Sequence, residues 1–108
     1  MEIKNIQSSQ IELTSAIERY IQGRVSAVAK LTDKFDPCEL TIHVKKTTGR
    51  QKKGQVFSME MNMTIPGRSF RAEAKRDDLY AAVDEATDDL KRQVRKHKEK
   101  MQDAERRG

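Results

Sequence analysis

The residues best suited to chemistry are the cations near the C-terminus, where residues 91–100 read KRQVRKHKEK. Residues 91–108 hold eight Lys or Arg against three Asp or Glu, whereas residues 1–90 hold fourteen of each sign. The net charge of +5 therefore lies entirely at this end of the chain. Ammonium and guanidinium groups neutralise phosphates and release counterions, so a neutral body with a basic end, about residues 91–107, predicts a nucleic-acid partner.

A structural explanation of the same residues competes with this one. Acidic residues early in a helix and basic residues late in it stabilise the helix dipole, and Asp88 pairs with Lys91 and Arg92 at i, i+3 and i+4. These effects reach about one turn from each helix end, so they do not require a basic run of ten residues. We therefore favour phosphate binding over a merely solvated face.

Other chemistries find little support. The stretch GRQKKG (49–54) lacks the spacing and the Lys-Ser/Thr pair of a phosphate-binding Walker loop. His43 and His97 are too few for a metal centre, and Cys38 falls on the apolar face of a strand. We expect His97, which lies among cations, to contact phosphate or a base. The sequence thus predicts no enzyme, no metal, no cofactor and no small-molecule substrate.

Length and composition set the class of protein. A chain of 108 residues predicts one domain, 1–108, and a single cysteine fits a reducing compartment. The N-terminus MEIKNIQSSQ lacks the basic start and apolar segment of a signal peptide, and no run approaches the roughly 20 apolar residues of a membrane span. We expect a cytoplasmic protein with no membrane partner.

Two segments have the hydrophobic period of a helix. In residues 11–35 the apolar residues follow a period of 3.6, with Thr14 as N-cap and Pro37 beyond the end. Gly23 interrupts this pattern, and we expect it to mark close packing on a sheet. Residues 77–107 form the second helix, with Asp77 or Asp78 as N-cap. Its apolar face comprises Leu79, Ala82, Val83, Ala86 and Leu90.

Four segments have the period of a strand: residues 2–7, 38–46, 57–65 and 70–75. Ile3 and Ile6 do not share parity, which predicts a bulge, and Ser8 to Gln10 read as a turn. In the other strands the apolar side consists of Cys38, Leu40, Ile42, Val44, Phe57, Met59, Met61, Met63, Ile65, Phe70, Ala72 and Ala74. The methionines are core filler.

The element order β-α-β-β-β-α predicts an α+β fold, a four-stranded mixed sheet with two helices packed on one face. The first helix is a crossover, so strands one and two are expected to be parallel, with a right-handed connection between them. The remaining strands are joined as hairpins. The open face is then polar, with Lys4, His43, Lys45, Arg71 and Lys75 among Glu39, Glu60 and Glu73.

The character of the nucleic acid follows from what the chain lacks. Single-strand platforms need exposed aromatic residues, and the few aromatic residues here fall mainly on core positions. Major-groove reading is disfavoured because there is no dimer signature, and membrane binding because the basic end lacks a bulky apolar face. Folded RNA, recognised by its backbone and shape, fits best.

Three stretches carry a resemblance to a known family. IELTSAI (11–17) resembles the start of helix one, DLYAAVDEATDDL (78–90) resembles the D-[LM]-Y-x-A-[IV]-D signature, and KRQVRKHKEK (91–100) resembles the R-Q-L-x-K-x-K basic end. The family is that of the bacterial ribosome hibernation-promoting factors, also called ribosome-associated inhibitors or sigma-54 modulation proteins. The order and the strand layout agree over essentially the full chain.

The resemblance implies binding to the small ribosomal subunit, through ribosomal RNA in the mRNA/tRNA channel. Translation would be inhibited, and ribosome hibernation promoted in stationary phase or stress. By position, the resemblance implies RNA contacts at Arg24, Lys30, Arg92, Lys96 and Lys98. Charge and strand parity add Lys45, Arg71, Lys75, Lys91 and Arg95. We expect Tyr80 of the signature to pack the helix start against the sheet.

The chain also departs from the family. Ala27 stands where many members carry lysine. The sequence resembles the short form of the family, so we do not expect the second domain by which long members pair ribosomes. We expect a monomer away from the ribosome. Two alternatives stay open: a protein-interaction regulator such as a sigma-factor modulator, and a general binder of structured RNA. A large apolar surface patch, which would favour the first alternative, is not visible in the pattern.

Overall fold

The structure is a computed structural model that describes residues 1–48 and 54–107, so most of the stretch GRQKKG lies outside the described residues. The expected element order is confirmed. The elements are β1 (Glu2–Ser9), α1 (Ser15–Leu31), β2 (Glu39–Thr48), β3 (Gln55–Ile65), β4 (Arg68–Arg76) and α2 (Leu79–Arg107).

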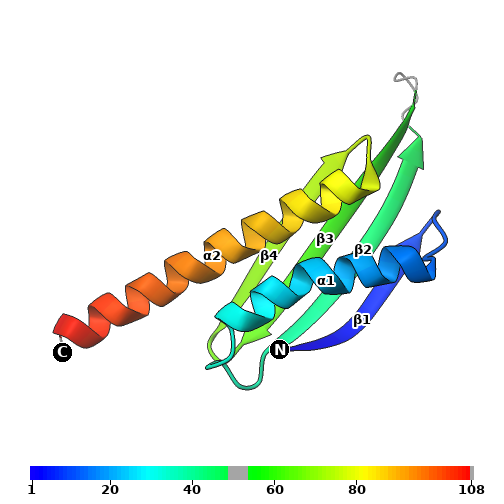
Figure 1. Cartoon of the computed structure of the whole chain (residues 1–108). Coiled ribbons are helices and arrows are strands. Elements are labelled where there is room, and N and C mark those ends of the chain that lie inside the picture. Colours follow the sequence, from blue (N-terminus) through cyan, green and yellow to red (C-terminus); the bar gives the residue numbers. More distant parts are fainter. Residues whose placement is uncertain (49–53, 108) are drawn as a thin grey trace.

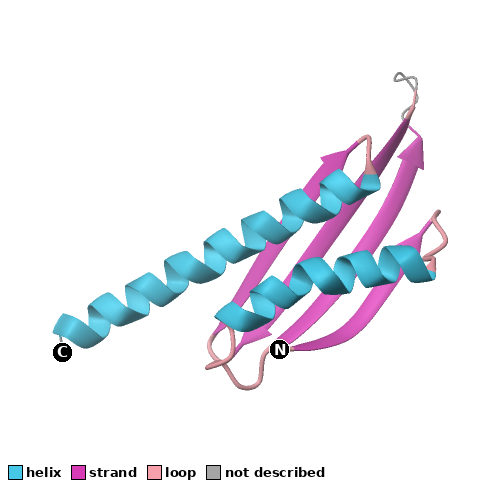
Figure 2. Ribbon diagram, viewed as in Figure 1, coloured by secondary structure: helices cyan, strands magenta, loops and turns pink. Residues whose placement is uncertain are grey.

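The four strands form one sheet in the order β1-β2-β3-β4. β1 runs parallel to β2, and the other neighbours are antiparallel. Both helices lie on the same face of this sheet (Figures 1 and 2). The predicted α+β fold with a mixed sheet is therefore confirmed, with the parallel pair joined through α1.

The first strand contains the expected bulge, because the register with β2 shifts between Ile3 and Asn5. Both Ile3 and Ile6 consequently pack against the core. The predicted turn was placed too early: Ser8 and Ser9 still pair with β2, and only Gln10 turns, with a φ of 62°. A polar residue does not end an edge strand while its backbone still finds hydrogen-bond partners.

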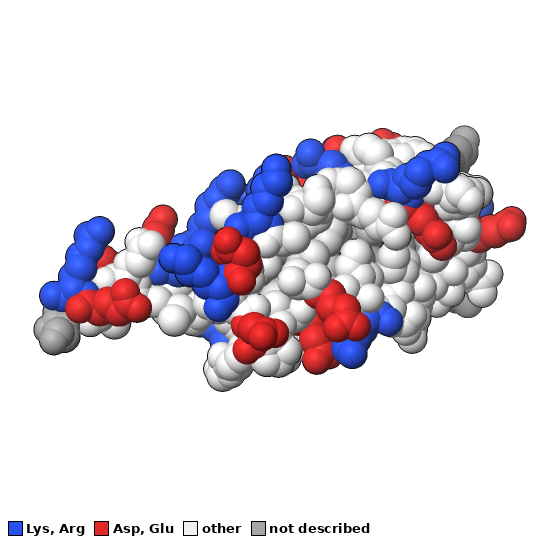
Figure 3. Space-filling view, turned by 60° about the horizontal axis from the view of Figure 1, so that its bottom comes forward, with Lys and Arg blue, Asp and Glu red and all other residues white. Residues whose placement is uncertain are grey.

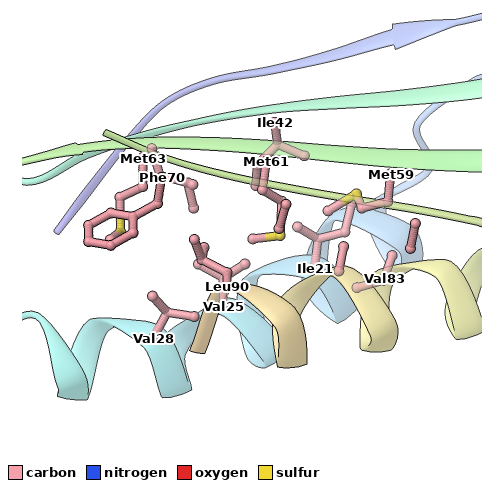
Figure 4. Close-up of a cluster of buried hydrophobic side chains, with 14 of the residues drawn as sticks. Ile21, Val25, Val28, Ile42, Met59, Met61, Met63, Phe70, Val83 and Leu90 are labelled. Carbon is pink, nitrogen blue, oxygen red and sulfur yellow. The ribbon is translucent and has the colours of Figure 1, made fainter. Parts of the chain in front are cut away.

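The core lies between the sheet and the two helices (Figure 4). The predicted alternation is confirmed along most of β2, β3 and β4, where apolar positions are buried and their neighbours are more exposed, but it fails at the start of β3, where the polar Ser58 is buried. Phe57, at the start of β3, is only partly buried. From the helices, the core receives Ile21, Val25, Val28, Ala82, Val83, Ala86, Leu90 and Val94.

The helix starts are also as predicted. The Thr14 hydroxyl accepts from the Ile17 backbone N–H at 3.2 Å, and Asp78, rather than Asp77, accepts from the N–H groups of Tyr80 and Ala81. The prediction for Gly23 was wrong. Gly23 is exposed, and an added Cβ there would meet nothing within 4 Å, because the position faces away from the sheet.

The second half of α2 extends beyond the sheet (Figure 1). At 1.5 Å per residue its 29 residues span about 43 Å, in a molecule whose longest extent is 55 Å. Val94 is the last fully buried residue of the helix, and Met101, two turns on, is 44% exposed. No helix among the described residues is long and apolar enough to cross a membrane.

Candidate nucleic-acid interface

Four cations line one side of α2 as it leaves the body of the protein. Lys91, Arg92, Arg95 and Lys96, here called the α2 cationic face, border an open hollow of about 610 Å³ together with Asp88 and Glu99. Residues three, four and seven positions apart share one side of a helix, so their charges gather. In Figure 3, Lys and Arg cluster where the projecting helix meets the body, with acidic residues nearby.

The opposite side of α2 holds these cations in place. Leu90 and Val94, one turn apart on the side of the helix away from these cations, are fully buried against the core. The helix therefore cannot rotate without exposing apolar surface. The α2 cationic face is thus mounted on a fixed support, which lowers the ordering cost of binding.

The pairing of these cations is weak. Lys91 Nζ lies 3.8 Å from Asp88 Oδ1, and Arg92 Nη1 lies 3.2 Å from Asp89 Oδ1. Single ion pairs at a protein surface contribute about 0–1 kcal/mol, and here only the Lys91 side chain, which is 21% exposed, is largely covered. Arg95 and Lys96 are exposed and form no ion pair within residues 1–48 and 54–107. All four cations therefore have donors available for phosphate.

Arg24 of α1 reaches across to α2 beside this face. Its Nε lies 2.9 Å from Asp84 Oδ1, and its Nη2 donates to Asp88 Oδ1 at 3.5 Å. Tyr20 donates its hydroxyl to the same Asp84 oxygen at 2.6 Å, and this hydrogen bond is the main reason that the pKa of Tyr20 is raised. Because Asp88 also pairs with Lys91, the structure brings Arg24 together with the first residue of the α2 cationic face.

The other two helical candidates lie near the end of α1. Lys98 Nζ donates to the backbone oxygen of Leu31 at 3.0 Å, so this ammonium caps the C-terminus of α1. A cation there is also favoured by the helix dipole. Lys30, in the last turn of α1, is exposed and has no ion pair in the described part of the chain. Sequence reasoning gave no signal for the structural contact of Lys98.

The three strand candidates lie on the open face of the sheet, away from the α2 cationic face. Arg71 Nη2 lies 3.3 Å from Glu60 and 3.4 Å from Glu73, and Lys75 lies 3.9 Å from Glu73. The pKa of Glu60 is lowered, first by a hydrogen bond from Asn62 and then by the charges of Arg71 and Lys45. The structure does not bring these cations together with those of the helices.

His97 packs against aromatic side chains, a contact that the sequence did not predict. Its ring packs against Phe35 and Phe70, with ring centroids 5.9 and 5.6 Å away. Burial, followed by the charges of Arg68 and Lys100, lowers its pKa. The imidazole therefore takes part in the packing at the point where α2 leaves the body, and its contact with phosphate or a base stays a prediction.

Tyr80 differs from expectation. Its ring meets Tyr20 of α1 edge-on, with centroids 4.7 Å apart, and is 41% exposed. Leu79, Ala82 and Val83 occupy the sheet-facing positions instead, because they lie on the other side of the helix turn. Tyr80 thus packs the start of α2 against α1 and not against the sheet.

One polar contact, made by Gln93, could be predicted only in part from the sequence. Gln93 Nε2 donates to the backbone oxygen of Arg71 at 2.8 Å and to Asp89 Oδ2 at 3.1 Å. The i, i+4 spacing of Asp89 and Gln93 was readable from the sequence. The contact with β4 was not, because it depends on where the helix lies across the sheet.

Comparison with known proteins settles the family. Residues 4–102 match the family described as Sigma 54 modulation protein / S30EA ribosomal protein. The chain belongs to this family. The resemblance drawn from the three sequence stretches is therefore confirmed. The family is one of ribosome-associated proteins and not of enzymes.

Two curated relatives carry names of one kind. The "Ribosome hibernation promoting factor" of Pseudomonas putida is 34% identical over 98 residues, which are 91% of this chain and 88% of the relative. The "Ribosome hibernation promotion factor" of Deinococcus radiodurans is 31% identical over 98 residues, again 91% of this chain. The chain spans only half the length of that relative.

Solved structures agree with the fold. The Thermus thermophilus Protein Y N-terminal domain superposes with a TM-score of 0.66 at 30% identity, covering 90% of this chain and 99% of that one. A ribosomal subunit interface protein from Coxiella burnetii superposes with a TM-score of 0.74 at 19% identity, covering 91% and 98%. The second likeness shows the shared fold alone.

Proposed function

We propose that this protein binds the small ribosomal subunit through ribosomal RNA in the mRNA/tRNA channel. By occupying the channel it inhibits translation and promotes ribosome hibernation in stationary phase or stress. The observation that carries the proposal is the α2 cationic face, four cations on one side of a helix anchored by Leu90 and Val94. The names of the hibernation factors from Pseudomonas and Deinococcus support the biological role.

The physical mechanism is phosphate binding by a rigid support. Each phosphate that is neutralised releases counterions, so affinity falls as salt rises. The logarithm of the affinity falls by about 0.7–0.9 per phosphate contact for each tenfold rise in salt concentration. RNA helices expose their phosphates and riboses in a fixed geometry, which a rigid row of cations can match by shape. Blocking follows from occupancy, because mRNA and tRNA would need the same space.

The ten candidate residues divide into two groups under this proposal. The first group contacts RNA directly and comprises Arg24, Lys30, Lys91, Arg92, Arg95 and Lys96. The second contributes less, because Lys98 holds the end of α1 and the strand cations face the other way among acids. We further propose that residues 1–108 act as one ribosome-binding domain in the cytoplasm, monomeric away from the ribosome.

The experiment compares two quadruple variants of equal net charge. One changes Lys91, Arg92, Arg95 and Lys96 to Gln, and the other changes the sheet-face cations Lys4, Lys45, Arg71 and Lys75 to Gln. Each lowers the net charge from +5 to +1, since four cations are neutralised. The helix variant should lose co-sedimentation with purified small subunits, and the sheet variant should keep most of it. Equal losses in both would show that affinity follows net charge and not the α2 cationic face.

A second candidate function is favoured by one observation, the family description itself, which includes sigma 54 modulation. A regulator of that kind would form a stoichiometric protein complex that survives nuclease treatment. A general binder of structured RNA would instead be displaced from ribosomes by an excess of duplex RNA. Co-sedimentation repeated after nuclease, and with competitor duplex, separates both from the proposed function.

A further inference from the structure

Two carboxylates lie beside the cations of the proposed RNA-binding surface. Asp84 and Asp88 are one turn apart on α2, and Asp88 borders the same hollow as the α2 cationic face. A polyanion approaching this hollow meets their negative charges. On charge alone, these acids would weaken the binding of RNA, and removing either would strengthen it.

We infer that Asp84 and Asp88 are positioning residues, which hold the guanidinium of Arg24 in place for a phosphate of the bound RNA. The inference rests on the proposed function and adds to it a role for acids within a cationic surface. Its basis is that both carboxylates, from successive turns of α2, contact the same arginine of α1.

The carboxylates are themselves held. Tyr20 donates its hydroxyl to Asp84 at 2.6 Å, and Tyr20 in turn packs against Tyr80. Asp88 lies between Arg24, at 3.5 Å, and Lys91, at 3.8 Å. Arg24 therefore extends from α1 to a fixed point beside the α2 cationic face and does not move freely in solvent.

Holding an arginine in advance matters because its side chain has many rotamers. A free arginine loses this freedom when it binds a phosphate, which weakens binding. An arginine already fixed by carboxylates has lost most of it on folding. The gain offsets the repulsion from the acids, whose charges Arg24 and Lys91 largely balance.

Arg24 also keeps donors for a ligand. A guanidinium has five N–H donors in a planar fork that suits phosphate. Among the described residues, only the Nη2 contact with Asp88 has hydrogen-bond geometry. The Nε lies close to Asp84 but does not point at an acceptor, so that contact is electrostatic. The Nε is buried, but the side chain as a whole is 39% exposed, so the donors that a ligand can reach are those of the terminal Nη groups.

The test compares Asp88→Ala with Glu99→Ala. Glu99 is a matched control, because it borders the same hollow, carries the same charge and forms no ion pair in the described part of the chain. Binding of each full-length variant to purified small subunits is measured at fixed salt. We expect Asp88→Ala to bind about tenfold more weakly, because Arg24 must then be ordered on binding, and Glu99→Ala to bind more tightly because a repelling charge is removed.

Two further readouts separate positioning from a general effect on structure. The salt dependence of log affinity should stay close to that of wild type in Asp88→Ala, because Arg24 keeps its charge and only the entropic cost of ordering it rises. In a chain that already carries Arg24→Ala, the Asp88→Ala change should no longer weaken binding. Melting temperatures are compared with wild type, and since Asp88 is 54% exposed we expect little change.

The outcomes are distinct. If Asp88→Ala tightens binding as much as Glu99→Ala does, the carboxylate only repels and the inference is wrong. A tenfold loss that persists in the Arg24→Ala chain would also overturn it, because the effect would then not pass through Arg24. If the wild-type chain itself does not bind small subunits, the proposed function fails before the variants are compared.

Discussion

Anchoring of α2 by Leu90 makes a prediction that links core packing to the interface. Leu90 is fully buried, one residue before the α2 cationic face begins. Replacing a buried leucine by alanine removes its transfer free energy and leaves a cavity, at a cost of about 3 kcal/mol. For a domain near 100 residues, each kcal/mol lowers the melting temperature by about 4–8 °C, so Leu90→Ala should lower it by roughly 12–24 °C.

Met101→Ala is the matched control on the same helix. Met101 lies three turns beyond Leu90, on the projecting part of α2, and is 44% exposed. Its replacement should change the free energy of unfolding by no more than about 0.5 kcal/mol. Both variants are compared by thermal and urea unfolding followed by circular dichroism, with binding to small subunits measured in parallel.

The refuting results are specific. A cost below about 1 kcal/mol for Leu90→Ala would mean that the base of the cationic face is not anchored by the core. A cost for Met101→Ala similar to that of Leu90→Ala would mean that the projecting end packs against something, such as a second copy. Unchanged binding of folded Leu90→Ala at low temperature would show that affinity does not depend on a rigid support.

Two other contacts, those of Lys98 and of His97, lead to testable predictions. Lys98→Ala should lower the free energy of unfolding by about 1 kcal/mol in urea unfolding, because the Leu31 carbonyl loses its charged donor. Lys100 is exposed, and the control Lys100→Ala should have almost no effect. The pKa of His97 is lowered on folding, so the unfolded chain takes up its proton first as pH falls through about 6.5. The contribution of neutral His97 to the free energy of unfolding is therefore fully present above that pH and is lost as the pH falls below it. His97→Leu should flatten this decline in unfolding curves recorded from about pH 7 to 5, and an unchanged decline would contradict the assignment.

Much of the fold could be predicted because each strand has one apolar and one polar side. The alternation through Leu40, Ile42 and Val44 identifies the buried face, and the broken parity of Ile3 and Ile6 identifies the bulge. Both patterns are local, so one sequence suffices to read them. The α2 cationic face could be predicted for the same reason, since helical spacing fixes which residues share a side.

The errors and omissions concern contacts between segments far apart in the chain. His97 meets Phe35 and Phe70, and Tyr80 meets Tyr20, across separations that no periodicity encodes. Helix periodicity shows which side of α2 is buried, but not which loop or helix borders that side. Gly23 was misread because a glycine within a helix has the same local pattern whether it faces a sheet or solvent.

The amide of Gln93 on the backbone of β4 has a consequence for assembly. β4 is an outermost strand of the sheet, and the Arg71 carbonyl that Gln93 occupies is an acceptor that an added strand from another molecule would use. With that acceptor taken, β-augmentation at this point of the border is disfavoured, as in other proteins that block the edges of their sheets.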